Sequence, residues 1–435
     1  MPPVREVATL KRALGRWDLT AIGVNQVIGS AIFLLPSDVA RQVGAWGPLA
    51  FMAVGLLSLS IALCFAEVGS RFDRTGGPYL PARTAFGRFV GFEVGWMMWF
   101  ARVTSQASVA NGLVLALAFY WPTLAGGASR AAVLVVLTLA ITWINVVGVK
   151  QSSWVVNALT IGKLAPLLVF IAVGIWYIEP AHFAVMPPVT REQGAAAAIL
   201  LIFAFGGYEV TGVLAGEAAN PRRDVPFAFV ATLIIVSVVM SLASVVATGV
   251  LPDVAATRTP LADGAAIFLG AAGALMISVG SVVSMTGNNM GQILNGSRTI
   301  FALAENGDLP RWFARVHPTF QTPSNAVLFT AAVAITLALT GSFVALAAVS
   351  AIARLVMYLA VCVSTLVLRR RTPTDEMSAA QFTVPLGPVV PVIASVVSLG
   401  ILAGASTQQL VAGSAALAAG AVLYLIATRL EGLKA

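Results

Sequence analysis

Charged side chains are scarce in this chain. Only 10% of its 435 residues are Asp, Glu, Lys or Arg, whereas 58% are hydrophobic, and the mean hydropathy is +0.90. A soluble globular protein carries about 25% charged residues. The composition therefore excludes an ordinary soluble domain and indicates a protein embedded in a lipid bilayer.

Residues that build reactive or metal sites are also few. The two cysteines, Cys64 and Cys362, lie inside apolar stretches, so we expect no structural disulfide. The two histidines, His182 and His317, lie in separate predicted loops and form no metal-ligand pattern. Ser-His-Asp arrangements and phosphate-binding loops are absent from the sequence. The sequence therefore predicts no enzyme, no ATP-driven pump, and neither a metal nor a cofactor.

Apolar segments long enough to cross a bilayer fill the chain, since a spanning helix needs about 20 residues. We expect twelve spans, of which the third and eighth are long enough to be strongly tilted or to extend out of the membrane. The loops are short, so a single all-α membrane domain is predicted. The expected spans are residues 18–40, 46–70, 89–119, 131–149, 154–178, 195–218, 227–250, 266–304, 325–340, 343–368, 387–406 and 409–428.

The net charge of +8 is distributed unevenly over this topology. Eighteen Lys and Arg residues fall in the N-terminal segment 1–17, the even-numbered loops and the C-terminus, and four fall in the odd-numbered loops. Positive residues accumulate on the cytoplasmic side of a membrane protein, so both termini are expected there. The basicity thus encodes orientation and indicates no nucleic-acid partner. The polar N-terminus predicts no cleavable signal peptide.

The first span is interrupted near its middle by Gly29, Ser30 and Ala31, and the sixth by Gly206 and Gly207. A break at this depth frees backbone groups that lipid cannot satisfy, so it persists only where it lines a cavity or contacts a ligand. Broken helices in corresponding positions indicate a secondary transporter built from inverted repeats; close helix packing at small residues is the alternative. The predicted repeats are residues 18–178 and 195–370, followed by two helices in residues 385–428.

Five stretches resemble motifs of the amino acid–polyamine–organocation (APC) superfamily. They run in order over most of the first ten spans, whereas the last two spans match only in hydropathy. The resemblance implies the LeuT-type fold, with broken helices one and six facing a central site, and transport of amino acids. The stretches are Ile28-Gly29-Ser30-Ala31-Ile32-Phe33 (family I-G-S-G-I-F, with Ala31 for the second glycine), Gly76-Gly77-Pro78-Tyr79 (S-G-G-x-Y), Phe203-Ala204-Phe205-Gly206-Gly207-Tyr208-Glu209 (F-x-F-x-G-F-E), Gly216-Glu217-Ala218-Ala219-Asn220-Pro221 (G-E-x-x-N-P) and Ala304-Glu305-Asn306-Gly307-Asp308-Leu309-Pro310 (A-x-D-G-x-L-P).

The two breaks supply complements to both charges of an amino acid. Free N–H groups at the start of the second half-helix suit a carboxylate, and free carbonyls at the end of the first half of span six suit an ammonium. The resemblance implies the same division, and it aligns Phe203 with an aromatic gate; a packing or lipid-facing Phe is the alternative. The predicted substrate site is Ile28, Gly29, Ser30, Ala31, Ile32, Phe203, Ala204, Gly206, Gly207 and Ser284, with space beside it at the two span-six glycines.

Lys163 lies about ten residues into the fifth span. An ionisable residue inside the membrane is costly and is a functional hypothesis by default. The resemblance implies that this lysine replaces the sodium ion of sodium-coupled relatives, so that its protonation alternates with transport. Its expected partners are the carbonyl of Asn25 and Ser281 or Ser284, and a lysine reaching to the interface is the alternative.

Glu209, Arg102 and Arg354 are further charged residues inside spans. Glu209 is expected to relay protons, to bond the span-one loop or to cap the second half-helix. The arginines either pair with Glu209 or Glu93, or attract an acidic substrate side chain, because guanidinium binds carboxylate with two hydrogen bonds. A cytoplasmic gate network is also expected, in which Glu67 and Glu217 join Arg74 or Arg222.

These features together predict a proton-coupled amino acid symporter that works by alternating access. The predicted partners are an amino acid as small-molecule substrate, the proton and the lipid bilayer, and the predicted location is a bacterial inner membrane, as monomer or homodimer. An exchanger of amino acids, or of an amino acid for its amine, is the alternative within transport, and a channel or nutrient receptor the alternative outside it. A neutral or apolar substrate is expected, with an acidic one left open by the two arginines.

Overall fold

The computed structural model describes residues 14–72, 76–147, 153–184, 186–374 and 377–432. Within these ranges the chain is almost entirely helical and contains no β-strand. The α-helices are α1 (Arg16–Val27), α2 (Ala31–Val43), α3 (Gly47–Gly69), α4 (Tyr79–Phe86), α5 (Arg88–Ala118), α6 (Gly127–Val147), α7 (Ser153–Gly174), α8 (Arg191–Phe205), α9 (Val210–Val213), α10 (Pro221–Val250), α11 (Pro260–Glu305), α12 (Ser324–Thr340), α13 (Phe343–Leu368), α14 (Val389–Ala403) and α15 (Thr407–Gly432). Short 3₁₀ turns are η1 (Gly44–Trp46), η2 (Pro122–Ala125), η3 (Ile175–Tyr177), η4 (Pro180–Phe183), η5 (Leu214–Glu217) and η6 (Arg311–Ala314).

The predicted all-α membrane fold is confirmed. Eight helical stretches of the described chain are long and apolar enough to cross a membrane, and one of them, Ala31–Gly69, contains both α2 and α3. The apolar helices α12 and α14 are shorter, and α5 carries buried polar side chains along its 31 residues. The twelve predicted spans correspond in order to α1–α2, α3, α5, α6, α7, α8–α9, α10, α11, α12, α13, α14 and α15.

Both predicted helix breaks are present. The first span is divided between Val27 and Ala31, and the sixth between Phe205 and Val210. Small residues at both places remove the side-chain packing that favours a continuous helix, and Gly207 has φ +124°, which only glycine adopts without strain. The division of the chain into two inverted repeats stays a prediction.

The eighth span differs from its expected form. Residues 266–304 were expected to form one long span, but α11 runs from Pro260 to Glu305 and leaves helical geometry at Gly270, with φ 62° and ψ −157°. A glycine without a Cβ turns the backbone there at no steric cost. The continuous helix of this span is therefore shorter than expected, because the first ten residues of α11, before Gly270, form a separate helical piece.

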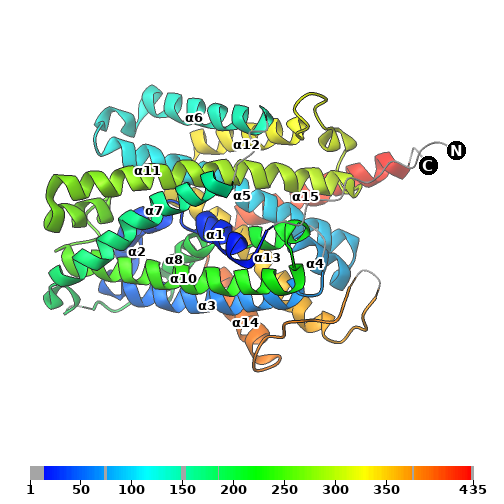
Figure 1. Ribbon diagram of the computed structural model, residues 1–435, viewed down its shortest axis with the longest axis horizontal. Helices are drawn as coiled ribbons and strands as arrows, with labels where there is room; N and C mark the ends of the chain where they lie inside the picture. Colours follow the sequence, from blue (N-terminus) through cyan, green and yellow to red (C-terminus); the bar gives the residue numbers. More distant parts are fainter. Residues whose placement is uncertain (1–13, 73–75, 148–152, 185, 375–376, 433–435) are drawn as a thin grey trace.

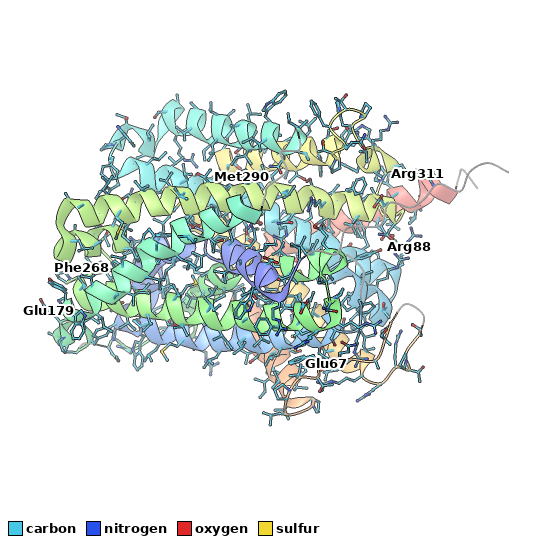
Figure 2. All side chains as sticks on the ribbon, viewed as in Figure 1. Glu67, Arg88, Glu179, Phe268, Met290 and Arg311 are labelled. Carbon is cyan, nitrogen blue, oxygen red and sulfur yellow. The ribbon has the colours of Figure 1, made fainter. Side chains whose placement is uncertain are left out.

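The helices pack as a bundle whose long axis is horizontal in Figure 1. In it α3 packs along α10, and α5 packs against both α11 and α13. The broken segment α1 lies in the middle of the view, surrounded by α7, α10 and α11 (Figure 1). Glu67, Arg88 and Arg311 lie at one end of the bundle, called the Glu67 end below, and Glu179 and Phe268 lie at the other (Figure 2).

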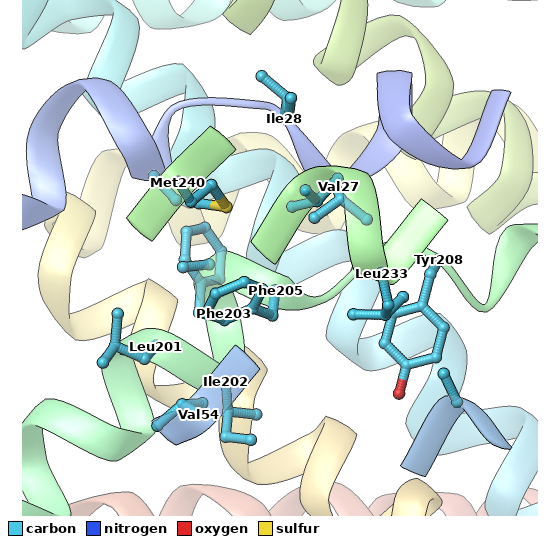
Figure 3. Packing of buried hydrophobic residues seen from close by; sticks show 14 of the residues in the cluster. Val27, Ile28, Val54, Leu201, Ile202, Phe203, Phe205, Tyr208, Leu233 and Met240 are labelled. Carbon is cyan, nitrogen blue, oxygen red and sulfur yellow. The ribbon is translucent and has the colours of Figure 1, made fainter. Parts of the chain in front are cut away.

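Apolar side chains surround the two breaks. Figure 3 shows Val27 and Ile28 of the first break close to Phe203 and Phe205 of the second. All four are at most 6% exposed. Tyr208 lies on the other side of the break, stacked with Tyr358 at a ring-centroid distance of 5.6 Å. The core of the bundle thus holds both breaks in fixed positions away from lipid.

Candidate substrate-binding site

The carbonyl groups that end α1 are held by side chains from two other helices. Lys163 Nζ on α7 donates to Asn25 O at 2.9 Å, to Asn25 Oδ1 at 2.6 Å and to Ile28 O at 3.0 Å. From α11, Ser284 Oγ lies 3.0 Å from both Ile28 O and Gly29 O, and Asn288 Nδ2 donates to Gln26 O at 2.7 Å. These contacts satisfy most of the carbonyls that the break leaves without a helical partner.

The amide groups that begin α2 are in the opposite situation. The described residues supply no hydrogen-bond acceptor for the N–H groups of Ser30, Ala31 and Ile32. Four such N–H groups are orphaned at every helix start, where the helix dipole is positive. The first break therefore presents its positive side to whatever lies next to it, since its negative side is already satisfied.

The second break is shaped by two glycines with different neighbours. A Cβ on Gly206 would lie 2.6 Å from the guanidinium of Arg354, and a Cβ on Gly207 would lie 2.6 Å from the carbonyl oxygen of Gln26. The expected open space at these glycines is therefore wrong: a side chain from α13 and the backbone of the first break fill it. The two breaks touch each other directly.

The carbonyl groups of the second break are only partly satisfied. Gly206 N donates to Phe203 O at 3.1 Å, so the Phe203 carbonyl is not the free acceptor that was expected. The carbonyls of Ala204 and Gly206 accept no hydrogen bond from the residues that the structure describes. They remain available for a cation next to the amide groups of α2.

A small cavity connects the two breaks. Its volume is about 10 Å³, room for about one water molecule, and its wall is part polar and part apolar. A second hollow, of about 20 Å³, is lined mainly by apolar residues between α3, α4 and α10 and does not touch the breaks, so it is not the site. The wall residues are Gln26, Val27, Gly29, Ser30, Ala31, Ser105, Val109, Phe203, Gly206, Asn288, Gln292 and Arg354.

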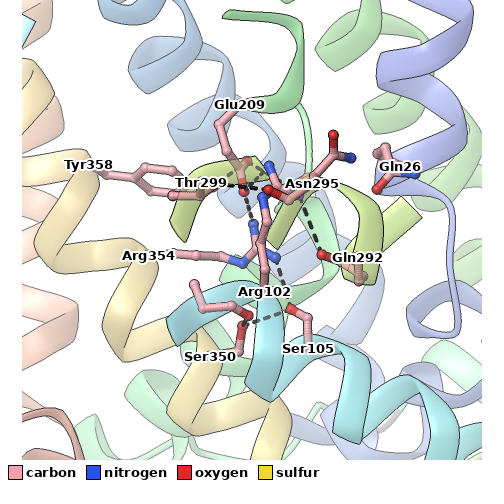
Figure 4. Close-up of polar contacts among 12 residues, drawn as sticks. Gln26, Arg102, Ser105, Glu209, Gln292, Asn295, Thr299, Ser350, Arg354 and Tyr358 are labelled. Atoms are coloured by element: carbon pink, nitrogen blue, oxygen red, sulfur yellow. Dashed lines mark hydrogen bonds and ion pairs between the residues drawn. The ribbon is translucent and has the colours of Figure 1, made fainter. Parts of the chain in front are cut away.

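Three charged side chains form a buried cluster beside this cavity. Figure 4 shows the Arg354 guanidinium reaching Glu209, with Arg102 beside them. Arg354 Nη1 pairs with Glu209 Oε1, and Arg354 Nη2 donates to Ser105 Oγ at 2.9 Å. Arg102 Nη2 lies 3.7 Å from the same Glu209 oxygen. The expected pairing of both arginines with Glu209 is present, whereas the alternative partner Glu93 contacts neither of them.

Glu209 also stabilises the break itself. Its Oε2 accepts a hydrogen bond from Gly207 N at 2.8 Å and one from Tyr358 at 3.4 Å. One carboxylate thus joins α5, α13 and the backbone of the second break. The expected cap on the second half-helix is absent, because the Glu209 side chain accepts from the break before α9 and not from the first turn of α9.

Of the three partners expected for Lys163, one is direct, one is indirect and one is absent. The Asn25 carbonyl is a direct partner, and Ser284 meets Lys163 through their shared acceptor, the Ile28 carbonyl. Ser281 is not part of the group, because its hydroxyl donates to the carbonyl of Ser278 in its own helix. Lys163 is fully buried, so the alternative of a lysine reaching to the interface is wrong.

The gate network at the Glu67 end has different members from those expected. Glu67 pairs with Arg369, which donates through Nε at 2.7 Å and Nη2 at 2.5 Å, and with Arg71 at 3.6 Å. These hydrogen bonds raise the pKa of Arg369 above its ordinary value. Arg74 lies outside the described residues, and Arg222 donates to Ser378 Oγ, not to Glu217. Glu67 and Arg369 were 302 positions apart, so no local pattern could pair them.

Two of the motif stretches meet at this same end. Tyr79 OH donates to Asp308 Oδ2 at 2.8 Å, and Arg88 Nε donates to Asp308 Oδ1 at 2.7 Å. Burial, reinforced by Asp308, raises the pKa of Tyr79 to about 12. The loop before α4 and the loop after α11 are therefore joined by a charge-assisted hydrogen bond.

Sequence reasoning missed several polar residues of the site. Asn288 and Gln292 follow Ser284 at intervals of four along α11, and positions four apart share one helix face. Ser105 and Ser350 are hydrogen-bonded at 2.8 Å, and each lies within one turn of a buried arginine. Polar residues at this spacing within an apolar span were the available signal.

Comparisons with known proteins agree with the motifs. A family model described as amino acid permease matches residues 14–426. Similar proteins of Bacillus subtilis (strain 168) include a methylthioribose transporter, 29% identical over 98% of this chain and 95% of that protein. The serine/threonine exchanger SteT is 28% identical over 90% of this chain and 91% of that protein. The branched-chain amino acid permease BcaP is 28% identical over 97% of this chain and 94% of that protein. Because the family model covers nearly the whole chain, this multi-pass membrane protein belongs to the amino acid permease family of the APC superfamily.

Proposed function

We propose that this protein is a secondary active transporter that carries amino acids across the plasma membrane by alternating access. One observation carries the proposal. The cavity between the breaks is lined by Ser30 and Ala31, whose N–H groups are unpaired, and by Gly206, whose carbonyl is unpaired. The first set complements a carboxylate and the second an ammonium, so the cavity matches the two charges that all α-amino acids share.

Phe203 is proposed as the gate over this cavity. Its ring lies in the cavity wall and meets Phe343 edge-on at 6.3 Å. Its 6% exposure supports this role over a lipid-facing one. A ring that pivots at the end of α8 closes or opens the cavity without disturbing the break beneath it.

Proton coupling through Lys163 is the finer part of the proposal. The ammonium group has three N–H donors, and it makes three hydrogen bonds to Asn25 and Ile28. A neutral amine has only two donors, so loss of the proton removes one of these bonds. The protonation state of Lys163 is thereby linked to the geometry of the first break, next to the proposed carboxylate site.

Exchange is the second candidate mechanism, favoured by the similarity to SteT, a serine/threonine exchanger. In an exchanger no driving ion is needed, and Lys163 serves only to hold the end of α1. The orientation is also proposed: Arg71, Arg88 and Arg369 gather at the Glu67 end, which is then the cytoplasmic end under the positive-inside rule.

Reconstituted proteoliposomes test the proposal. Uptake of a panel of labelled amino acids is measured with and without an inward proton gradient, and counterflow is measured without any gradient. Wild type is compared with Lys163→Ala and with the surface control Arg191→Gln. Symport predicts gradient-stimulated uptake that the Lys163 variant loses and the control keeps. Counterflow that ignores the gradient in all three proteins selects exchange, and uptake that never saturates with concentration indicates a channel.

A further inference from the structure

The buried cluster beside the cavity contains more positive than negative charge. Arg102, Arg354 and Glu209 are each at most 1% exposed, and the two guanidinium groups share the single carboxylate. Guanidinium groups stay protonated in proteins. The cluster therefore holds one net positive charge inside the membrane-embedded part of the protein, where an uncompensated charge is strongly unfavourable.

The surplus charge is concentrated on Arg102. Arg354 is well neutralised, because it pairs with Glu209 and donates to Ser105. Arg102 makes a single hydrogen bond, from Nη1 to Gln292 Oε1 at 3.3 Å, and its Nε and Nη2 have no hydrogen-bond acceptor among the described residues. Buried donors of this kind normally have a hydrogen-bond acceptor, so the two free donors of Arg102 can bind an acceptor from a ligand.

One unsatisfied guanidinium donor, Arg354 Nε, belongs to the cavity wall, and Arg102 lies behind that wall, joined to it through Gln292. Gln292, the partner of Arg102, and Ser105 and Arg354 all lie in the cavity wall, and Arg354 Nε is also without an acceptor among the described residues. The opposite part of the wall is the start of α2, which is positive as well. Lys163, the other buried cation near the first break, adds to this field and does not reduce it.

No other acidic residue of the described chain compensates the cluster. Glu93, the second carboxylate of α5, has both oxygens buried without a hydrogen-bond partner and does not contact either arginine. Glu67 and Asp308 are engaged by Arg369 and Arg88 at the Glu67 end. The missing negative charge must therefore come from a ligand in the cavity.

We infer that the transported substrate carries a second anionic group, as an acidic amino acid does. Its α-carboxylate binds the N–H groups that begin α2, and its ammonium binds the carbonyl of Gly206. Its side-chain carboxylate binds at the edge of the cavity formed by Arg354 and Gln292, next to Arg102. This inference rests on the proposed function and names its substrate class. It replaces the neutral or apolar substrate expected from the sequence.

Isosteric pairs test the inference in wild-type protein, without any variant. Glutamate is compared with glutamine, and aspartate with asparagine, in uptake by proteoliposomes and in thermal stabilisation of the detergent-purified protein. Gluconate replaces chloride in all buffers, so that no small inorganic anion occupies the site, and chloride is titrated in a separate experiment. We expect each acid to be preferred over its amide at least about tenfold, as for a site whose buried polar groups are left unpaired by the analogue.

Arg102→Gln then locates the preference. This change removes the surplus charge and leaves the Arg354–Glu209 pair intact, so the acid-to-amide ratio should fall to about one while amide uptake persists. Arg102→Lys keeps the charge and should retain part of the preference, and Arg191→Gln, at the exposed start of α8, should leave the ratio unchanged.

Three results overturn the inference. The first is that wild type takes up neutral amino acids in preference to acidic ones, which overturns the inference but leaves the proposed function unaffected. Stabilisation by chloride that disappears in Arg102→Gln, with no preference for glutamate over glutamine, assigns the surplus charge to an inorganic ion. Absence of uptake and counterflow for every amino acid tested overturns the proposed function together with the inference.

Discussion

Lys163 and Ser284, from α7 and α11, donate hydrogen bonds to the same carbonyl oxygen, that of Ile28, at 3.0 Å each. A carbonyl oxygen has two lone pairs, so both donors are accommodated. The end of α1 is thus fixed from two sides by a charged and a neutral donor. Movement of either helix relative to the other changes the geometry of the first break.

Ser284→Ala should weaken substrate binding about fivefold, equivalent to the loss of about 1 kcal/mol from one hydrogen bond. The hydroxyl holds the carbonyls of Ile28 and Gly29, and without it the start of α2 is less well ordered. Ser281→Ala is the matched control, since Ser281 is buried on the same helix but bonds only within α11. Equal affinities in substrate titrations of the two variants would contradict the assignment.

Gly207→Ala should abolish transport and lower stability by about 1–3 kcal/mol. The residue has φ +124°, and its added Cβ would lie 2.6 Å from the Gln26 carbonyl oxygen, where the two breaks meet. Gly194→Ala in the first turn of α8 is the control, because its Cβ would meet only Val189 Cγ1 at 3.9 Å. The comparison uses thermal melting in detergent and initial uptake rates. A Gly207 variant as stable and active as the control would show that the contact between the breaks is dispensable.

Tyr79→Phe should destabilise the protein by about 1.5 kcal/mol through loss of a buried hydrogen bond to a charged acceptor. Because the pKa of Tyr79 is raised from 10.0 to about 12, this contribution is present below pH 10 and is lost as the pH rises from 10 towards 12. The difference in the free energy of unfolding between wild type and variant should therefore be constant from pH 5 to pH 9.

A double-mutant cycle with Asp308→Asn measures the coupling between these two residues. The cycle should give a non-zero interaction energy, since Tyr79 OH and Asp308 Oδ2 are 2.8 Å apart. Strictly additive melting shifts, or a Tyr79→Phe effect that varies between pH 5 and pH 9, would be incompatible with this contact.

Arg369→Gln should lower stability by about 3 kcal/mol, because among the described cations it leaves the fully buried Glu67 only the more distant Arg71, beside the N–H of Val384. The double variant Arg369→Gln/Glu67→Gln removes the orphaned charge and should recover part of the loss. Arg222→Gln is the comparison at the same end, as the partner of Arg222 within the described part of the chain is a neutral serine hydroxyl. The measurement is the melting temperature of each variant. If the double variant recovers none of the lost stability, the effect of Arg369→Gln is not electrostatic.

Most of the fold was readable from the sequence. The apolar segments predicted the spans to within a few residues, and α13 begins and ends where it was expected. The interruption at Gly29–Ala31 and the pair Gly206–Gly207 located both breaks. The Gly270 kink was missed, because one glycine inside an apolar run does not show whether its backbone leaves the helix.

The predictions for side-chain partners were less complete. Lys163 was correctly associated with Asn25, but Ser281 points back into its own helix, and Glu67 meets Arg369 where Arg74 was expected. Asn288 and Gln292 were overlooked although they repeat at helical spacing. Each error concerns which side chain of a helix faces which neighbour.

The sequence by itself determined the elements whose causes are local. Long apolar runs make spanning helices, and small residues in mid-span end them, since both effects act within a few residues of the backbone. The tertiary structure decided how charges are paired. Glu209 and Arg354 are separated by 145 positions, and only the packing of α13 against the second break brings them together, with Arg102 left in surplus.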